Sequence, residues 1–144
     1  MYHWLHRASY DYYIKQDNLF VYPLAIINGI SSMITLIGVT YEEKIDPKVL
    51  ALVSGTINLA TGILTGIYKK MNYNAIIEGH RKTSENFSRI SRNISNQLSL
   101  RPSERERMPK YFHNKMDDYE KILDSAPILS NKILKKFSRK FKNV

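Results

Sequence analysis

The stretch NLFVYPLAIINGISSMITLIGVTY, Asn18–Tyr41, contains 24 residues and no charged side chain. A second uncharged stretch, VLALVSGTINLATGILTGIY, covers Val49–Tyr68 with 20 residues. The hydrocarbon layer of a bilayer is about 30 Å thick, which a helix of about 20 apolar residues crosses. Both stretches are long enough. The sequence therefore predicts two membrane spans.

The residues between the two stretches, 42–48, form a short charged connector. Asp46 can cap a helix, and Pro47 suits the first helical position, where a backbone N–H is not needed. A connector of this length suits an antiparallel helix pair. It is too short for a re-entrant pore helix with a carbonyl filter, which excludes a potassium-channel architecture.

The charge of the chain is concentrated after the second stretch. The net charge is +9, and the segment after Tyr68 holds 18 Lys or Arg against 8 Asp or Glu. Lys69 and Lys70 follow the second stretch directly, and basic residues near span ends stay on the cytoplasmic side. We expect a multi-pass integral membrane protein with both termini in the cytoplasm. The first stretch is too long and begins too late for a cleaved signal peptide.

Polar side chains recur along both stretches at helical spacing, so that each set shares one face. We expect them to line a pore or to pack helix against helix, and the sequence leaves both alternatives open. The candidates are Asn28, Ser31, Thr35, Ser54, Asn58, Thr61 and Thr65. An adjoining stripe of small residues, Gly55, Gly62 and Gly66, is expected to allow close helix packing.

The absence of Asp, Glu, Lys and Arg from both stretches limits the function classes. It excludes a proton relay, a voltage sensor and a charged filter ring within the spans. Two spans cannot enclose a pore alone, so a pore requires several copies around a symmetry axis. We expect a homo-oligomeric pore or weakly selective ion channel. The alternative is a structural or membrane-remodelling protein, for example a viral membrane component, with a tail that binds lipid or a partner.

The expected fold is an all-α membrane protein in four segments. Residues 1–18 form an interfacial amphipathic helix, because Trp and Tyr favour the headgroup layer, and residues 19–68 form a two-helix transmembrane hairpin. Residues 69–100 continue the second helix into the cytoplasm, with Gly79 as a weak point. Residues 101–144 form a short basic helical tail. It contains one helix from Tyr111 to Ser125 and another that Ser130 caps.

Basic residues are expected to face lipid at two places. The last helix carries basic residues around an apolar face, which is typical of a membrane-surface element. Anionic lipid is therefore a possible partner, whereas nucleic acid is not expected. The alternative is a solvated tail docked on the chain's own helices. The expected lipid-facing residues are Lys69, Lys70, Lys132, Lys135, Lys136, Arg139 and Lys140.

No catalytic pattern stands out in the sequence. There is no cysteine, no phosphate-binding glycine loop and no serine in a nucleophile elbow. The histidines His3, His6, His80 and His113 lack metal-ligand spacing. Each is expected to be an interfacial or solvated side chain. We expect no enzyme activity, no metal and no cofactor.

Four features occur in a specific order along nearly the whole chain. They are the aromatic start from Trp4 to Tyr13, the polar-striped hairpin, the stretch Glu78–Ser88, and Tyr119–Leu123 followed by Ala126-Pro127-Ile128. In this order the chain resembles the SLATT family, two-transmembrane effector modules of nucleotide-sensing conflict systems with standalone versions in large DNA viruses. The resemblance implies a membrane effector that oligomerises and opens a pore. Prokaryotic relatives are paired with a nucleotide-generating or nucleotide-binding partner, and this chain shows no recognisable sensor domain.

Overall fold

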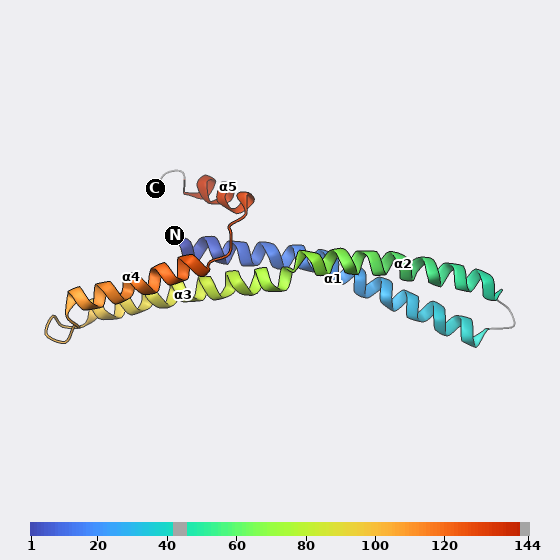
Figure 1. Cartoon of the computed structure of the whole chain (residues 1–144), viewed down its shortest axis with the longest axis horizontal. Coiled ribbons are helices and arrows are strands. Elements are labelled where there is room, and N and C mark those ends of the chain that lie inside the picture. The colour runs from blue at the N-terminus through green and yellow to red at the C-terminus, as the bar shows by residue number, and fades with distance from the viewer. Residues whose placement is uncertain (42–45, 142–144) are drawn as a thin grey trace. The chain divides into compact units, whose positions relative to one another are not determined.

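The computed structural model describes residues 1–41 and 46–141, and in this part of the chain every regular element is a helix. The predicted all-α fold is confirmed. The connector residues 42–45 and Lys142 lie outside the described residues, so the acidic connector stays a sequence prediction. The helices are α1 (Tyr2–Thr40), α2 (Pro47–Met71), α3 (Tyr73–Ser99), α4 (Met108–Ser125) and α5 (Asn131–Lys140) (Figure 1).

The contacts divide the chain into two compact units. Residues 14–73 form the first, which we name the helix pair. Residues 1–13 and the described residues from 74 onward form the second, which we name the helix cluster. The start of α1 thus packs with α3, α4 and α5, whereas its longer remainder packs with α2. The sequence did not predict this partnership for residues 1–13.

In the helix pair, α1 and α2 run antiparallel and face each other through one stripe from each helix. Contacts at the two ends show the direction, since Gly38 lies at Leu50 and Asp17 lies at Tyr68. The half-buried or buried positions recur every three or four residues, which is one face of a helix. They are Phe20, Leu24, Ile27, Ser31, Ile34 and Gly38 on α1, and Leu50, Ser54, Ile57, Thr61, Thr65 and Tyr68 on α2.

The predicted start of α2 is confirmed, and the helix that was predicted to continue to residue 100 is interrupted at Asn72. The carboxylate of Asp46 accepts a hydrogen bond from the backbone N–H of Lys48 at 2.9 Å, and Pro47 begins the helix. Asn72 adopts the left-handed conformation with φ of 48°, which ends α2 before α3 begins at Tyr73. Asn tolerates this conformation better than most residues. Gly79, the expected weak point, lies inside an unbroken α3.

The helix cluster has a small core in which polar residues outnumber apolar ones. Leu5, His6 and Ser9 of α1 are buried, as are the α3 residues His80, Thr83, Ser84 and Phe87. One buried residue from each later helix completes the core, Ile122 from α4 and Ile133 from α5. Small side chains such as Ser9 and Ser84 let two helix backbones approach closely.

The last two helices follow the sequence signals closely. α4 starts at Met108 with Pro109 in its first turn, three residues earlier than predicted, and ends at Ser125 as predicted. The residue after it, Ala126, is extended, as expected before a proline. Ser130 caps α5 by accepting a hydrogen bond from the backbone N–H of Lys132. Pro127 packs at Gly79, where an added Cβ would lie 3.1 Å from the proline ring.

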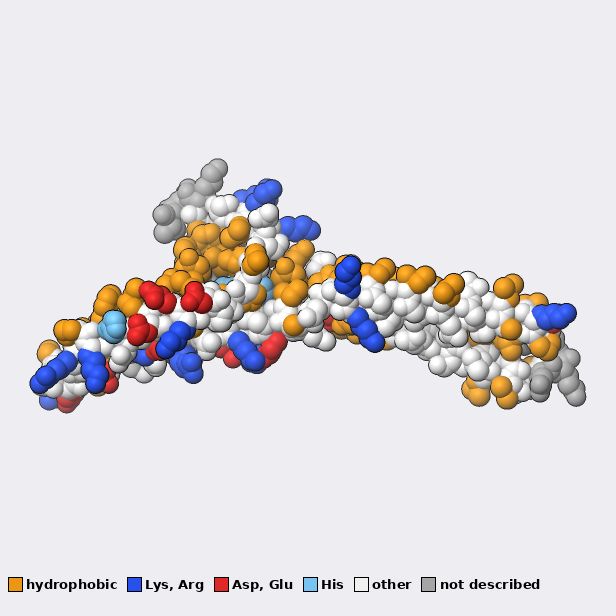
Figure 2. Space-filling model, in the orientation of Figure 1, with side chains coloured by type: hydrophobic (Ala, Val, Ile, Leu, Met, Phe, Trp, Pro, Cys, Tyr) orange, Lys and Arg blue, Asp and Glu red, His pale blue; other side chains and the backbone are white. Residues whose placement is uncertain are grey.

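Two helical stretches are long and apolar enough to cross a membrane, within α1 and within Pro47–Ser99. Only 6% of each apolar window is buried. On the face shown in Figure 2, α2 presents hydrophobic side chains with charged ones only near its ends, whereas charged side chains gather over α3 and α4. The core helix of a soluble protein would bury such residues. Outside their facing stripes, these helices instead leave their Leu and Ile side chains exposed, for example Leu36 and Leu59.

We expect Gly38→Val to destabilise the helix pair by about 1–3 kcal/mol, because an added Cβ would collide with the side chain of Leu50 and overpack the contact. The matched control is Gly29→Val on the same helix, where nothing lies within 4 Å of an added Cβ. The measurement is the free energy of unfolding of each purified variant in detergent. Equal losses for the two variants would contradict the observed packing.

Candidate functional site

One hydrogen bond between side chains joins α1 to α2 in the middle of the helix pair. The hydroxyl of Ser31 donates to Oδ1 of Asn58 at 3.1 Å. Asn has a second polar group, its amide NH₂, which makes no hydrogen bond within the described residues. In lipid, such polar contacts hold helices together because the alternative is an unsatisfied group in hydrocarbon. The side chain of Asn58 therefore uses its oxygen within the chain and has its NH₂ group left to donate.

Three of the five hydroxyl groups of the candidate stripe are satisfied within their own helices. Thr35 donates to the carbonyl of Ser31, Ser54 to that of Leu50, and Thr61 to that of Ile57, all four residues back and at 2.8–3.0 Å. Ser32 does the same toward Asn28. This back-bonding removes the need for an outside partner. The asparagine amides are therefore the main polar groups of the helix pair that still need a hydrogen-bond partner.

The structure divides the predicted polar residues into two groups. Ser31, Ser54, Thr61 and Thr65 are half-buried on the stripes where α1 and α2 face each other, whereas Asn28, Thr35 and Asn58 are exposed. The sequence treated each set as one face, and the structure separates its members. Packing between α1 and α2 is therefore one role for the first group, and pore lining stays a prediction for both groups.

The three glycines predicted for close packing do not pack against any described residue outside their own helix. An added Cβ at Gly55, Gly62 or Gly66 would meet nothing within 4 Å. Gly38 is the glycine on which the contact between α1 and α2 depends, and the sequence reading did not select it. Its signal was present, since Gly38 lies seven residues after Ser31 on the same helical face. Packing at the other three against a second chain stays a prediction.

Polar and aromatic side chains pack together at one end of the helix pair, near the basic residues in the last turn of α2. The phenol of Tyr68 donates a 2.8 Å hydrogen bond to the carboxylate of Asp17. The rings of Phe20, Tyr68 and Tyr73 lie within 6.4 Å of one another, centre to centre. Lys69 and Lys70 follow in the exposed last turn of α2. Aromatic and basic residues at one helix end are typical of a membrane–water boundary.

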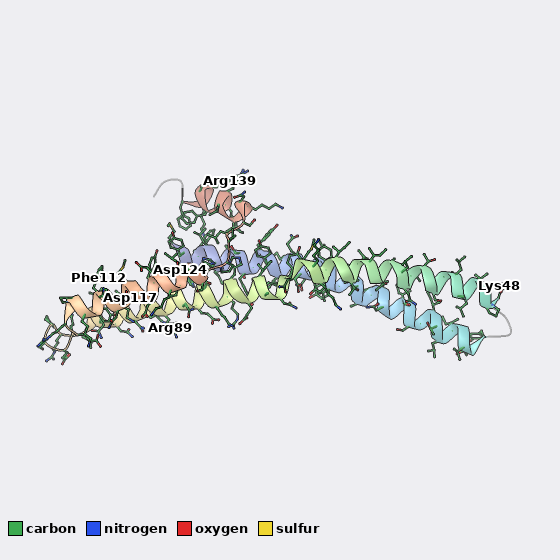
Figure 3. The ribbon with its side chains drawn as sticks, in the orientation of Figure 1. Lys48, Arg89, Phe112, Asp117, Asp124 and Arg139 are labelled. Carbon is green, nitrogen blue, oxygen red and sulfur yellow. The ribbon has the colours of Figure 1, made fainter. Side chains whose placement is uncertain are left out.

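The basic residues of α5 are exposed, while its apolar side is used inside the helix cluster. Phe137 and Phe141 lie 5.7 and 5.5 Å from the ring of Trp4, centre to centre. Arg139, labelled in Figure 3, is one of the exposed cations, as is Lys132. The docked arrangement matches the alternative of a tail that covers its own helices. Lipid contact by Lys132, Lys135, Lys136, Arg139 and Lys140 stays a prediction.

Two histidines form a buried pair at the centre of the helix cluster, and the expectation that each is interfacial or solvated is wrong for these two. His6 is 2% exposed and His80 is 0% exposed. Their Nδ1 atoms lie 2.9 Å apart, so one ring donates its proton to the other. Nε2 of His80 is buried and makes no hydrogen bond within the described residues.

The surroundings of the histidine pair favour neutral rings. Tyr13 stacks on His80 and Phe87 stacks on His6, with ring centres 5.5 and 6.0 Å apart. No carboxylate lies within ion-pair distance of either ring in the described part of the chain. Burial, and secondarily the charge of His6, lowers the pKa of His80 from 6.5 to about 4. Burial also lowers the pKa of His6. A signal was present, since His80, Ser84 and Phe87 share one helical face.

No cluster of three metal-ligating side chains occurs among the described residues. His113 lies 3.8 Å from Asp117 on the exposed side of α4, as a solvated histidine would. Comparison of the chain with protein-family models, curated proteins and solved structures finds no match. The resemblance to the SLATT family therefore remains a prediction from the sequence.

We expect the helix cluster to lose stability between pH 7 and pH 5. Below pH 6.5 the unfolded chain binds protons that the folded rings do not accept, so acid favours unfolding. For His80 alone the loss reaches roughly 3 kcal/mol when the pH falls to its folded pKa of about 4. Carboxylates whose pKa is lowered in the folded chain, such as Glu78 at about 2, also stabilise the fold. Their contribution to the stability is lost only as the pH falls below their ordinary pKa of 4.5, and thus below the interval from pH 7 to pH 5. The fluorescence of Trp4, the single tryptophan, follows the unfolding.

The matched variants are His80→Asn and His113→Asn. Asparagine places an amide near the position of Nδ1, so His80→Asn keeps a hydrogen-bond partner for His6 and removes the titrating ring. We expect His80→Asn to flatten the pH dependence and His113→Asn, on the solvated side chain, to leave it unchanged. Retention of the full pH dependence in His80→Asn would contradict the assignment to this pair.

Proposed function

We propose that the chain is an integral membrane protein whose helix pairs assemble around a common axis into a weakly selective ion pore. One observation carries the proposal. Asn58 is exposed on α2, and its amide NH₂ makes no hydrogen bond within the described residues. Polar side chains within spans are costly in lipid and face the interior of a bundle or a water-filled cavity.

The neighbours of Asn58 favour assembly. Gly55 and Gly62 lie three and four residues from it on the same face, and both are open. Glycine lets a second helix approach, and asparagine can then hydrogen-bond across the contact or face water beside it. Because the pair of helices has no enclosed interior of its own, several chains are needed to form a path.

The orientation in the membrane follows from charge. Lys69 and Lys70 are exposed in the last turn of α2, and the positive-inside preference places this end on the cytoplasmic side. The segments that flank the helix pair along the chain, residues 1–13 and the described residues from 74 onward, would then also be cytoplasmic. This arrangement gives a multi-pass protein with both termini in the cytoplasm. The pore would discriminate weakly among ions because its wall is neutral.

A second candidate function rests on α5. Five basic side chains of this helix are exposed, although Lys132 and Lys140 also lie over the rings of Tyr12 and Trp4 in the helix cluster. Basic residues near an anionic membrane surface are worth about 1 kcal/mol each. In this alternative the chain shapes or scaffolds a membrane without conducting ions. It predicts binding that depends on anionic lipid and the absence of ion flux.

The test is ion flux through liposomes that contain the purified oligomer. We expect Asn58→Leu to lower flux about ten-fold or more, because a ring of leucines makes a hydrophobic constriction that excludes water. Ser31→Ala is the matched variant, since it removes the hydrogen bond to Asn58 and leaves the Asn58 side chain in place. We expect this variant to conduct.

The outcomes separate the alternatives. Absence of flux from an oligomer verified by cross-linking would refute the pore. If Asn58→Leu and Ser31→Ala lower assembly and flux to the same extent, Asn58 acts in packing between α1 and α2. If flux is absent but liposome binding rises with anionic lipid, the scaffold function of α5 replaces the pore.

A further inference from the structure

Two hollows lie side by side between α3 and α4 in the helix cluster. The first, the apolar hollow, encloses about 280 Å³. Its walls repeat at four-residue intervals on each helix, with Ile90, Ile94 and Leu98 from α3 and Met108, Phe112 and Met116 from α4. Residues four apart stack on one helical face. The two antiparallel helices therefore present facing apolar stripes with a space between them.

The side chains around the apolar hollow are not covered by the rest of the chain. Leu98 is 55% exposed and Phe112 is 66% exposed; Phe112 is labelled on α4 in Figure 3. At another point along the same helices, side chains of α3 and α4 are in direct contact, since Phe87 and Tyr119 pack edge to face with ring centres 5.7 Å apart. The apolar stripe of α3 is thus buried at one end and open at the other.

The second, the polar hollow, encloses about 400 Å³ and is lined by the amides of Asn93, Asn96 and Asn114. Gln97, Glu106, Tyr111 and Lys115 line both hollows and form a shared wall. An apolar space that continues into an amide-rich space has the polarity pattern of an amphiphile. The tail of an amphiphile would be removed from water in the apolar hollow, and its head would find hydrogen-bond partners in the polar hollow.

The shared wall contains an unused polar group and two opposite charges. The hydroxyl of Tyr111 is buried and makes no hydrogen bond within the described residues. Buried hydroxyl groups are normally paired, so an oxygen of a bound molecule would complete this one. Glu106 and Lys115 place one anion and one cation on the wall. Lys115 holds Asp118 at 2.7 Å, and Arg105 is committed to the carbonyls of Leu98 and Leu100.

These charges select among head groups. A fatty-acid carboxylate would lie near Glu106, with Arg105 committed to carbonyls and only Lys115, which it would share with Asp118, to offset the two negative charges. A zwitterionic head can offer an ammonium to Glu106 and a phosphate to Lys115 and Tyr111. The apolar hollow, at about 280 Å³, is slightly smaller than typical ligand pockets, which measure about 300–1,000 Å³. It suits one acyl chain. A helix of another protein, about 10–12 Å across, would fill it with less than one turn.

We propose that α3 and α4 bind a single-chain zwitterionic lipid of the lysophospholipid class. Its acyl chain lies between the stripes of Ile90, Ile94 and Leu98 and of Met108, Phe112 and Met116. Its phosphate–ammonium head lies in the polar hollow against Glu106, Lys115 and Tyr111. The site is independent of ion conduction by the helix pair.

The test uses the full chain in diacyl-phosphatidylcholine liposomes with a lysophosphatidylethanolamine that carries a diazirine in its acyl chain. Photolysis is followed by mass spectrometry of the labelled peptides. We expect saturable labelling in residues 90–98 and 108–116, which unlabelled lysophosphatidylethanolamine removes. Probe dissolved in the bilayer is expected to label the helix pair without saturation, and this labelling serves as the internal reference. A diazirine on a two-chain phosphatidylethanolamine is expected to label only the helix pair.

Matched variants separate the tail from the head. Ile94→Trp fills the apolar hollow and is expected to lower the saturable labelling at least five-fold, whereas Ile128→Trp, at a side chain that is 92% exposed, leaves it unchanged. Glu106→Gln removes the partner of the ammonium, and Glu104→Gln changes an exposed neighbour that lines neither hollow. We expect only Glu106→Gln to weaken competition by lysophosphatidylethanolamine.

Three results would overturn the proposal. One is labelling in residues 90–98 and 108–116 that does not saturate. Another is equal competition by a monoacylglycerol or a fatty acid, which would remove the zwitterionic head from the assignment. The third is cross-linking of a cysteine introduced at Phe112 to a second chain together with absence of saturable labelling, which would assign the face to another copy. Helical content measured by circular dichroism confirms that each variant is folded.

Discussion

Removal of apolar side chains from water is the constraint on which the arrangement of the helix pair depends. Each square ångström of apolar surface kept from water contributes about 25 cal/mol, and the windows of α1 and α2 are only 6% buried by the chain itself. Their facing stripe is narrow and contains glycine and hydroxyl residues. The outer surface, which is rich in Leu and Ile, therefore determines the environment that the pair needs. A bilayer would supply that environment, and the inner stripe determines how the two helices meet.

Small residues set the separation of helices in both units. In the helix pair, Gly38 admits the side chain of Leu50. In the helix cluster, Ser9 is fully buried and donates to the carbonyl of Leu5 at 2.9 Å, while Ser84, almost as buried, donates to the carbonyl of His3 on α1 at 3.3 Å. A hydroxyl that bonds its own helix can be buried without a partner on the neighbouring helix. The cluster can therefore have a polar core, with the histidine pair bonded at its centre.

The sequence predicted the elements better than their partners. The charge-free stretches, Asp46 with Pro47, and Ser130 were sufficient for three helices, because spans and caps are local signals. The break at Asn72 was missed because one asparagine in left-handed conformation has no strong sequence signature. The burial of His6 and His80 was missed because their contact joins residues 74 apart. Likewise, heptad spacing placed Ser31 and Thr35 on one face, but only the packed partner shows that Thr35 is exposed.

The exposed apolar surfaces of the two units suit different environments. Ion pairs lie beside the apolar surface of the helix cluster, whereas charged residues lie only at the ends of that of the helix pair. Around the outer surface of α2, charged residues are confined to the ends, so lipid can cover the whole length. Along α3 and α4, the ion pairs of Arg81 with Glu78 and Glu85, and of Lys115 with Asp118, lie on the same helices as the apolar stripes. Ion pairs of this kind are solvated, and burying them in hydrocarbon would be costly. The open stripes between these helices therefore need an occupant small enough to leave the ion pairs in water. A single acyl chain meets that requirement, whereas immersion in a bilayer does not.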